Sequence, residues 1–461
     1  MSTAASLRLP GLDQLAVERV RAARAVAAPV THGRVSEVLG LQLRVRGVEA
    51  GVGDLVEVLP SYGGAGGQPP AGGALAEVVA GDRDGLVCLP LTATAGLRTG
   101  MPVRATGGPL RIPVGVQLRG RVLDGLGRPI DGGPALDHLP HVGIDNQAPA
   151  PLDRARITHQ VGLGVRALDG LVPCGRGQRL GIMAGSGVGK STLLSMVARG
   201  TEAAVSVIAL VGERGREVRE FIEHDLGPDG LARSVVVVAT SDAPPVERLR
   251  AAFVATRIAE WFRDTGEDVV LMMDSLTRVA MAQREVGLSA GEPPATRGYP
   301  PSVFALMPRL LERAGPAATG SITGLYTVLV EGDDLQDPIG DTARSILDGH
   351  VVLTRALATA GHFPSIDVLE SISRVTNAVT TPQQRADATR LRRLLAAHRD
   401  VRELVEIGAY VAGTDADADT ALALMSQIEQ FLRQDVEDTV PVEETWRQLH
   451  ELVGSVPEVA A

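Results

Sequence analysis

A glycine-rich segment with one lysine, GSGVGKST at residues 185–192, carries the clearest chemical signal in the sequence. Lys190 is the only lysine among 45 basic residues, and the others are all arginine. A lysine ammonium is a compact point charge on a flexible stem, whereas the arginine guanidinium is planar and forked. The retention of a point charge within a glycine-rich segment indicates phosphate binding.

The residues on either side predict the strand, turn and helix of a phosphate-binding loop. Gly185, Gly187 and Gly189 would turn backbone amides toward the phosphates, and the helix N-terminus would add the positive end of its dipole. We expect Lys190 to reach the β- and γ-phosphates of ATP, and Ser191 to offer its hydroxyl to Mg²⁺. The expected nucleotide contacts are Ala184, Gly185, Ser186, Gly187, Val188, Gly189, Lys190, Ser191 and Thr192. Ala184 replaces the first glycine of the pattern, which is tolerable if its φ stays negative.

Two carboxylates follow apolar runs that read as strands. Glu213 comes after AVSVIALVG, where it could face the γ-phosphate and polarise a water molecule for attack. The alternative is an ordinary glutamate of a surface loop. Asp274 ends DVVLMMD, where it could hold Mg²⁺ through the water shell of the ion. Its alternative is a helix N-cap, a role that Ser275 could fill equally well.

The sequence divides into four segments that differ in their pattern of apolar, polar and glycine residues. A chain of 461 residues is expected to form roughly three domains. Residues 1–29 hold a helix pattern that either packs on the domain or docks a partner. Residues 30–108 have short strands with glycine turns, which predict a small β-barrel. Residues 109–378 alternate strands with helices, which predicts an α/β domain with a mostly parallel sheet, and residues 379–461 have helical periodicity alone.

Within the α/β segment, apolar runs predict individual elements. The predicted strands are residues 178–185, 204–212, 234–240, 268–274, 321–330 and 350–357, and the clearest helices are residues 246–266 and 301–315.

Composition excludes several classes of protein. The net charge of −10 and the aromatic content of 3% argue against a nucleic-acid partner, which favours a basic face and stacking platforms. Two cysteines cannot form a disulfide framework, and the scattered histidines have no metal-ligand spacing. No apolar run approaches the roughly 20 residues that span a bilayer, and the first residues lack a secretory signal pattern. We therefore expect a cytoplasmic protein.

Longer motifs resemble the type III secretion ATPases, including their flagellum-specific branch, which belong to the superfamily of rotary ATP synthase α and β subunits. The similarity runs from Gly33 to about Asp435. Its main motifs are GERGREV, RVAMAQREVGLSAGEPPATRGYPPSVFALMPRLLERAG, LVEGDDLQDPIGDTARSILDGHVVLTR and GHFPSIDVLESISRV. EGDDLQDPI and GLGRPIDG look closest to the flagellum-specific branch. The resemblance implies an RecA-like nucleotide-binding domain between the barrel and the helical domain.

The resemblance also implies roles for individual residues. Glu213 matches the glutamate that activates water, while Arg214 and Arg278 match arginines that support it and the phosphate pocket. Arg374 matches an arginine finger inserted into the site of the neighbouring subunit. Phe363 replaces a tyrosine that stacks on adenine, and a phenyl ring keeps the stacking face. Phe431 either closes the other side of the base or packs in the helical core.

The function implied is ATP hydrolysis by a homohexamer that energises flagellar type III protein export. Having both Glu213 and Arg374, identical copies could complete every site in a ring. The alternatives are the equivalent ATPase of a non-flagellar injectisome, an RNA-translocating helicase of the same core, and a catalytically silent docking scaffold. Partners implied by the family are a regulatory stator protein at the N-terminal helix, export-gate components, export substrates and chaperones. The family also implies peripheral association with the inner membrane at the base of the export apparatus.

Overall fold

The computed structural model describes residues 32–60, 73–330 and 337–454, which form two compact units. One unit contains the described residues up to Pro90 together with Thr94–Gly108, and the other contains residues 91–93 and the described residues from Pro109 onward. The N-terminal helix predicted within residues 1–29 lies outside the described residues.

The first unit is a closed barrel of six strands with the order β1-β2-β5-β4-β3-β6. The strands are β1 (His32–Leu39), β2 (Gln42–Arg46), β3 (Asp54–Val58), β4 (Ala74–Asp82), β5 (Gly85–Pro90) and β6 (Pro102–Pro109). Alternate residues point inward, so that Val35, Leu43 and Val45 join a buried core with Val56 and Val78. The predicted small β-barrel is confirmed.

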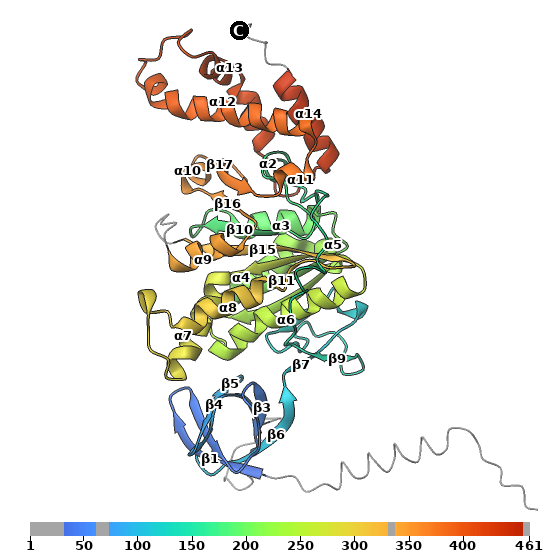
Figure 1. Cartoon of the computed structure of the whole chain (residues 1–461), viewed down its shortest axis with the longest axis vertical. Coiled ribbons are helices and arrows are strands. Elements are labelled where there is room, and N and C mark those ends of the chain that lie inside the picture. Colours follow the sequence, from blue (N-terminus) through green and yellow to red (C-terminus); the bar gives the residue numbers. More distant parts are fainter. Residues whose placement is uncertain (1–31, 61–72, 331–336, 455–461) are drawn as a thin grey trace, which may run out of the picture. The chain divides into compact units, whose positions relative to one another are not determined.

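The second unit contains a large, mostly parallel sheet (Figure 1). Its strand order is β17-β16-β10-β15-β13-β11-β12-β8. Its strands are β8 (Val122–Asp124), β10 (Arg179–Ala184), β11 (Val205–Glu213), β12 (Ser234–Thr240), β13 (Asp268–Asp274), β15 (Ser321–Leu329), β16 (Gly349–Leu353) and β17 (Ile366–Ser373). Only β17 on this path runs antiparallel to its neighbour, and the two-residue β14 (Gly315–Pro316) pairs antiparallel with β15. A separate ribbon pairs β7 (Arg111–Pro113) with β9 (His141–Gly143). The predicted α/β fold class is confirmed.

Two strands on the main path of the large sheet lie outside those predicted, as do the short strands β7, β9 and β14, and one predicted strand is too long. β8 and β17 were not among the predicted strands, whereas the run predicted over residues 350–357 ends as a strand at Leu353. Thr354 caps the short helix α10 (Arg355–Thr359), because its side chain accepts a hydrogen bond from the Leu357 backbone amide at 3.4 Å. A capping threonine thus ends the apolar strand and starts a helix.

The helices of the second unit that precede residue 380 accompany this sheet (Figure 1). They are α2 (Arg166–Leu171), α3 (Lys190–Gly200), α4 (Gly215–Glu220), α5 (Gly227–Ala232), α6 (Pro245–Asp264), α7 (Leu276–Ser289), α8 (Pro301–Leu311), α9 (Pro338–Ile346), α10 and α11 (Thr376–Val379), with 3₁₀ turns at Val116–Leu118 and Thr296–Gly298 and a π-helical turn at Phe221–Leu226. The predicted helices over residues 246–266 and 301–315 correspond to α6 and α8.

Three helices end the described chain: α12 (Pro382–Glu406), α13 (Ala416–Leu432) and α14 (Val442–Gly454). A capping box fixes the start of α12, because the Thr381 and Gln384 side chains each bond to the backbone of the other residue. The three helices pack on one another and on α2, and no strand lies among them. This is the helical region that the periodicity predicts.

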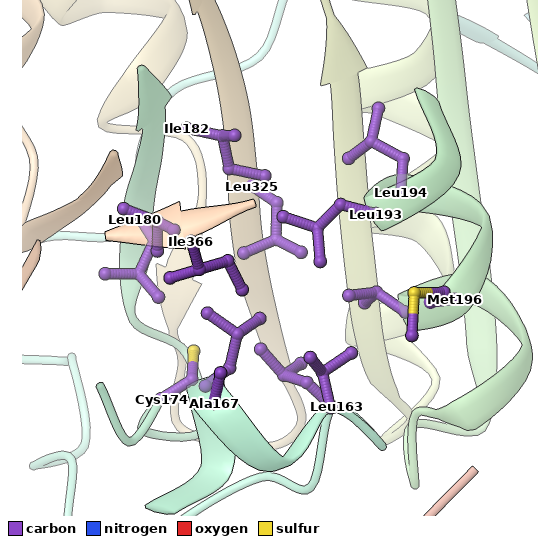
Figure 2. Close-up of a cluster of buried hydrophobic side chains, with 14 of the residues drawn as sticks. Leu163, Ala167, Cys174, Leu180, Ile182, Leu193, Leu194, Met196, Leu325 and Ile366 are labelled. Atoms are coloured by element: carbon purple, nitrogen blue, oxygen red, sulfur yellow. The ribbon is translucent and has the colours of Figure 1, made fainter. Parts of the chain in front are cut away.

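The hydrophobic core beneath the glycine-rich loop holds α3 against the sheet. Figure 2 shows Leu193 and Met196 of α3 among buried side chains of β10 and β15, including Ile182 and Leu325. Leu193 is 1% exposed and Leu325 2%. Burying a leucine side chain contributes about 1.5–3 kcal/mol, so this packing anchors the first turn of α3 and the loop that precedes it.

Candidate nucleotide site

The segment between β10 and α3 has the backbone of a phosphate-binding loop. Gly187 and Gly189 have φ of 75° and 92°, values that side-chain-bearing residues rarely adopt. Among the described residues that are not glycine, only Arg297 has positive φ, so Ala184 occupies the first glycine position without strain. Lys190 begins α3 directly after Gly189, which places its ammonium at the helix N-terminus.

Lys190 lies between two carboxylates that end neighbouring parallel strands. Its Nζ is 2.6 Å from Asp274 Oδ1 and 3.3 Å from Glu213 Oε1. Glu213 ends β11 and Asp274 ends β13, and these strands pair in parallel, so both carboxylates reach the same edge of the sheet. The structure therefore brings together three residues that lie far apart in sequence, at the edge where α/β sheets bind ligands.

Burial and charge set the protonation of this group. Burial lowers the pKa of Lys190, but the carboxylates of Asp274 and Glu213 outweigh it and leave the pKa raised, so the ammonium stays charged. Burial also raises the pKa of Glu213; the Asp274 charge adds to this rise, and Lys190 opposes it. A glutamate with a raised pKa beside the lysine of such a loop is suited to accepting a proton.

Asp274 is not the N-cap of α7, because Ser275 fills that role. The Ser275 side chain accepts a hydrogen bond from the Arg278 backbone amide. Asp274 is 2% exposed, and its Oδ1 accepts a hydrogen bond from Thr327 Oγ1 at 2.8 Å. Thr327, on the adjacent strand β15, was not predicted, because no local pattern links a threonine inside an apolar strand to a carboxylate 53 positions away.

The predicted arginines beside Glu213 have different surroundings. The aliphatic stem of Arg278 packs on Gly212, where an added Cβ would lie 3.0 Å from Arg278 Cβ. Arg278 Nε is buried without a hydrogen-bond partner among the described residues. The Arg214 side chain is 78% exposed and donates to Glu217 Oε1 at 3.1 Å. Arg278 thus lies against the strand that carries Glu213, and Arg214 lies in a surface ion pair.

The connection between β16 and β17 lies against the phosphate-binding loop. A Cβ added to Gly189 would lie 3.5 Å from a ring carbon of Phe363, whose side chain remains exposed. Ser365 Oγ donates to the Val188 carbonyl oxygen, and Arg355 donates to the Ser186 carbonyl oxygen at 3.2 Å. These two bonds to the loop were not predicted, since they join segments more than 160 positions apart.

The two predicted phenylalanines occupy different surroundings. Phe363 is 42% exposed beside the loop, whereas Phe431 is 7% exposed within the core cluster that also contains Leu449. A Cβ added to Gly170 would lie 3.5 Å from the end of the Phe431 ring. The structure therefore shows Phe431 in helical-core packing, which is one of the two roles that the sequence left open.

Arg374 lies away from this loop, toward the opposite edge of the sheet. It follows β17, whose first residue, Ile366, pairs with Leu353, and whose last residue, Ser373, pairs with Gly349. Because β17 is antiparallel, Arg374 is displaced from the loop edge by roughly 13 Å along the strands, at about 3.3 Å for each residue of β16 from Leu353 to Gly349. The exposed Arg374 guanidinium donates to the Arg344 carbonyl oxygen at 3.1 Å.

Fold and site together define a phosphate-binding-loop nucleotide domain, preceded in the sequence by a β-barrel and followed by a helical region, and comparisons with known proteins agree. Residues 164–373 match the model of the ATP synthase alpha/beta family, nucleotide-binding domain. Residues 380–451 match the T3SS EscN ATPase C-terminal domain.

The chain is 50% identical to a "Flagellum-specific ATP synthase" of Bacillus subtilis over 425 residues, which is 92% of this chain and 95% of the relative. It is 51% identical to a "Type 3 secretion system ATPase" of Xanthomonas euvesicatoria, over 93% of this chain and 95% of the relative. The solved structure of the assembled ATPase EscN from enteropathogenic E. coli has a TM-score of 0.85 and 46% identity, covering 91% of this chain and 100% of that one. The chain belongs to the family of flagellum-specific and type III secretion ATPases, and it is an ATPase.

Proposed function

We propose that the chain hydrolyses ATP at sites shared between identical copies in a closed ring of six, and that this hydrolysis energises flagellar type III protein export. One observation carries the proposal. Glu213 lies beside the phosphate-binding Lys190, whereas Arg374 lies toward the opposite edge of the same sheet. A chain with this arrangement can use Arg374 only in the site of a neighbour, and a ring lets every copy do so.

Within one copy, Lys190 binds the β- and γ-phosphates together with the backbone amides of the loop. Phosphate binding shifts the ammonium away from Glu213, which then accepts a proton from a water molecule. The oxygen of that water attacks the γ-phosphorus, the bond from this phosphorus to the oxygen that bridges it to the β-phosphate breaks, and ADP and inorganic phosphate are the products. Arg278, whose stem packs on Gly212 beside Glu213, supports the glutamate and the phosphate pocket. For Arg214 the same role rests on the resemblance to the family, because its exposed side chain pairs with Glu217 in this structure.

The residues of this site would hold Mg²⁺ when it binds together with the nucleotide. Among the described residues, no group of three or more histidine, cysteine, aspartate or glutamate side chains could hold a metal ion by itself. Mg²⁺ usually keeps several waters and takes most of its other ligands from substrate phosphates, so a full protein cage is not required. Ser191, exposed on the first turn of α3, would hold the ion, and Asp274 would hold its water shell. Bound there, Mg²⁺ would neutralise charge on the phosphates.

Phe363 would stack on the adenine, because its exposed ring lies next to Gly189 at the mouth of the loop. Phe431 would then support the base site only indirectly. The Phe363 carbonyl oxygen accepts a hydrogen bond from the Gln434 backbone amide at 2.9 Å, three residues beyond Phe431 in the same helical region. The core position of Phe431 thereby fixes the segment that holds Phe363.

The export role rests on the relatives, whose names include flagellum-specific and type III secretion enzymes. A second solved relative, EscN in complex with its central stalk EscO, covers 91% of this chain at 45% identity. We propose corresponding partners here: a stalk, a stator protein at residues 1–29, export-gate components, substrates and chaperones. We also propose the domain limits 30–108, 109–378 and 379–461, and a cytoplasmic location at the inner membrane. Within the described residues, no helix is long and apolar enough to cross a membrane.

A non-flagellar injectisome is the second candidate system, because the Xanthomonas euvesicatoria relative is as similar as the flagellar one. The ATPase chemistry is the same in both systems. Deleting the gene in its own organism separates them: loss of flagella with normal injectisome secretion supports the flagellar role, and the reverse supports the other.

Mixing two inactive variants tests the shared site. Glu213→Gln keeps the finger and loses the base, while Arg374→Ala keeps the base and loses the finger. In randomly mixed rings about a quarter of the interfaces pair an intact Glu213 with an intact Arg374, so an equimolar mixture should recover about a quarter of wild-type activity. As control, mixing Glu213→Gln with Lys190→Ala should recover nothing, because both changes damage the same half of the site. Failure of the first mixture would refute a finger acting between subunits.

A further inference from the structure

Gln178 is a fully buried glutamine whose amide bonds to the segments that hold Arg374. It is 0% exposed. Its Nε2 donates to the Asp348 carbonyl oxygen at 2.8 Å and to Ser373 Oγ at 3.1 Å, and its Oε1 accepts from the Gly175 backbone amide at 2.8 Å. A buried amide with its donors and acceptor satisfied fixes the groups around it, because any movement would leave a buried polar group unpaired.

The Asp348 carbonyl oxygen also accepts a hydrogen bond from the Arg374 backbone amide, at 3.0 Å. Gln178 and Arg374 therefore share one acceptor, and Gln178 additionally contacts the residue that precedes Arg374. The bond from the Arg374 guanidinium to the Arg344 carbonyl oxygen completes the set. Both ends of the Arg374 residue, backbone and side chain, are thus fixed to the segment that leads into β16.

Asp348 is itself held by the residue after Gln178. Its carboxylate accepts from the Arg179 backbone amide at 3.1 Å and from the Arg179 guanidinium at 3.1 and 3.2 Å. The Asp348 backbone amide donates to the Arg179 carbonyl oxygen at 2.8 Å. Arg179 also pairs with Glu312 at 2.6 Å, so its guanidinium has carboxylates on two sides. Asp348 has no freedom to shift independently of the start of β10.

Close backbone packing confirms how tightly this region is assembled. Gly349 pairs with Ser373, and a Cβ added to Gly349 would lie 2.4 Å from the Ile372 carbonyl oxygen. Only glycine permits this approach. The chain that carries Arg374 therefore lies directly on the chain that follows Asp348.

We propose that Gln178 is a positioning residue for Arg374, holding the finger of one subunit in the orientation that the site of its neighbour requires. The inference rests on the proposed function of Arg374. Gln178 immediately precedes β10, and the other end of β10 enters the phosphate-binding loop. Strand β10 thus connects the phosphate-binding loop of a subunit with the segment that holds Arg374, the finger that this subunit would insert into the site of its neighbour.

Gln178→Met tests the proposal, because methionine is close to glutamine in length and shape but lacks the amide bonds. We expect kcat to fall about tenfold or more, since small misplacements of a reacting group are costly. The affinity for a fluorescent ATP analogue should stay within about twofold, because Lys190 lies at the other end of β10. Gln160→Met is the matched control. Gln160 donates to the Asp169 carbonyl oxygen at 2.8 Å and accepts from Trp446 at 3.0 Å, so it loses a comparable pair of bonds elsewhere.

The mixing assay separates positioning from a general structural role. Gln178→Met keeps its own Glu213, so mixing it with Glu213→Gln should raise activity to about a quarter of wild type, above either variant alone. If that mixture shows only half the residual activity of Gln178→Met, the glutamine acts on its own subunit and the proposal is wrong. Wild-type kcat in Gln178→Met would also overturn it, as would an equal loss in Gln160→Met.

Two further arms keep the test decisive. If Arg374→Ala fails to recover activity with Glu213→Gln, then the shared site itself is refuted and the positioning role falls with it. If Gln178→Met does not fold, as judged by circular dichroism, Ser373→Ala is the second variant. It removes only the contacts of Ser373 Oγ with the Gln178 amide, at 3.1 and 3.4 Å. Ser373→Ala should lower kcat about twofold to threefold. Its equimolar mixture with Glu213→Gln should then show about a third of wild-type activity, whereas half of its own residual activity, about a quarter of wild type or less, would show that the residue acts on its own subunit; that result, or unchanged kcat in the variant, would count against the proposal.

Discussion

Glu213 combines two requirements of a general base, proximity to the phosphate-binding lysine and a raised pKa. Burial is the main cause of the raised pKa, and the neighbouring Asp274 adds to it. Below its pKa the glutamate is protonated and cannot accept a proton from water. We therefore predict that kcat/KM falls on the acid side at a pH above the usual glutamate range, measured from pH 5 to 9 with circular dichroism confirming the fold.

The charge of Arg278 supplies the control for this pH profile, because it lowers the pKa of Glu213. Arg278→Gln should move the acid limb to higher pH, and the direction would hold even if the variant were slower overall. An acid limb at the pH of an exposed glutamate, or one that stays in place in Arg278→Gln, would contradict the assignment of Glu213 as the base.

Single residues of the site differ in how far the sequence could predict their position. Glu213 and Asp274 each end an apolar run, and Lys190 ends the glycine-rich loop that follows another. Because parallel strands end at one edge of the sheet, the convergence of these residues could be expected. Thr327 and Ser365 could not be predicted, because their hydrogen bonds join segments whose proximity only the folded sheet creates. The core position of Phe431 likewise depends on the packing of α13 against α2, which periodicity does not specify.

At the scale of elements, the loop between β10 and α3 depends on glycine at one particular position. Gly189 has φ of 92°, and a Cβ there would lie 3.5 Å from the Phe363 ring. An alanine in left-handed backbone costs about 1–2 kcal/mol, whereas its contact with the proposed adenine platform would be an ordinary van der Waals contact, so the backbone strain is the main cost. We predict that Gly189→Ala weakens ATP binding about tenfold or more, as measured by isothermal titration calorimetry.

Gly143→Ala is the matched control for this substitution. Gly143 lies in β9 with no positive φ, and an added Cβ would meet no atom within 4 Å. Its ATP affinity should equal that of the wild type. Equal affinity in Gly189→Ala would show that the left-handed backbone at this position is not required for binding.

Regular elements were predictable where one physical pattern dominates. The buried parallel strands β10, β11, β12, β13 and β15 are nearly continuous apolar runs, which is the signature of burial on both faces. β8 has only three residues, and β17 reads IDVLESIS, in which polar residues interrupt the apolar run. Those two strands form because they pair with neighbouring strands of the sheet, and their own sequence has no clear strand pattern. The sequence alone therefore did not predict them.

For the whole molecule, the separation of Glu213 from Arg374 has a consequence for assembly. The barrel and the nucleotide-binding unit each have a core of their own, so a single copy can fold without neighbours. Its nucleotide site would nevertheless lack an arginine finger. Binding of ATP should then be a property of one copy, and rapid hydrolysis a property of the assembly.

We predict that ATPase activity per subunit rises steeply with protein concentration, because at low concentration the ring dissociates and its subunits lose the Arg374 of their neighbours. An arginine finger contributes about 10³–10⁵-fold to hydrolysis in other phosphate-binding-loop enzymes, so even partial assembly should dominate the measured rate. The measurement is the initial rate across a hundredfold range of concentration, with the oligomer followed by mass photometry. Arg374→Ala should bind ATP normally, and its low rate per subunit should not change with concentration. A wild-type rate per subunit that stays constant while rings dissociate would show that each copy contains a complete site, and would exclude Arg374 as a finger.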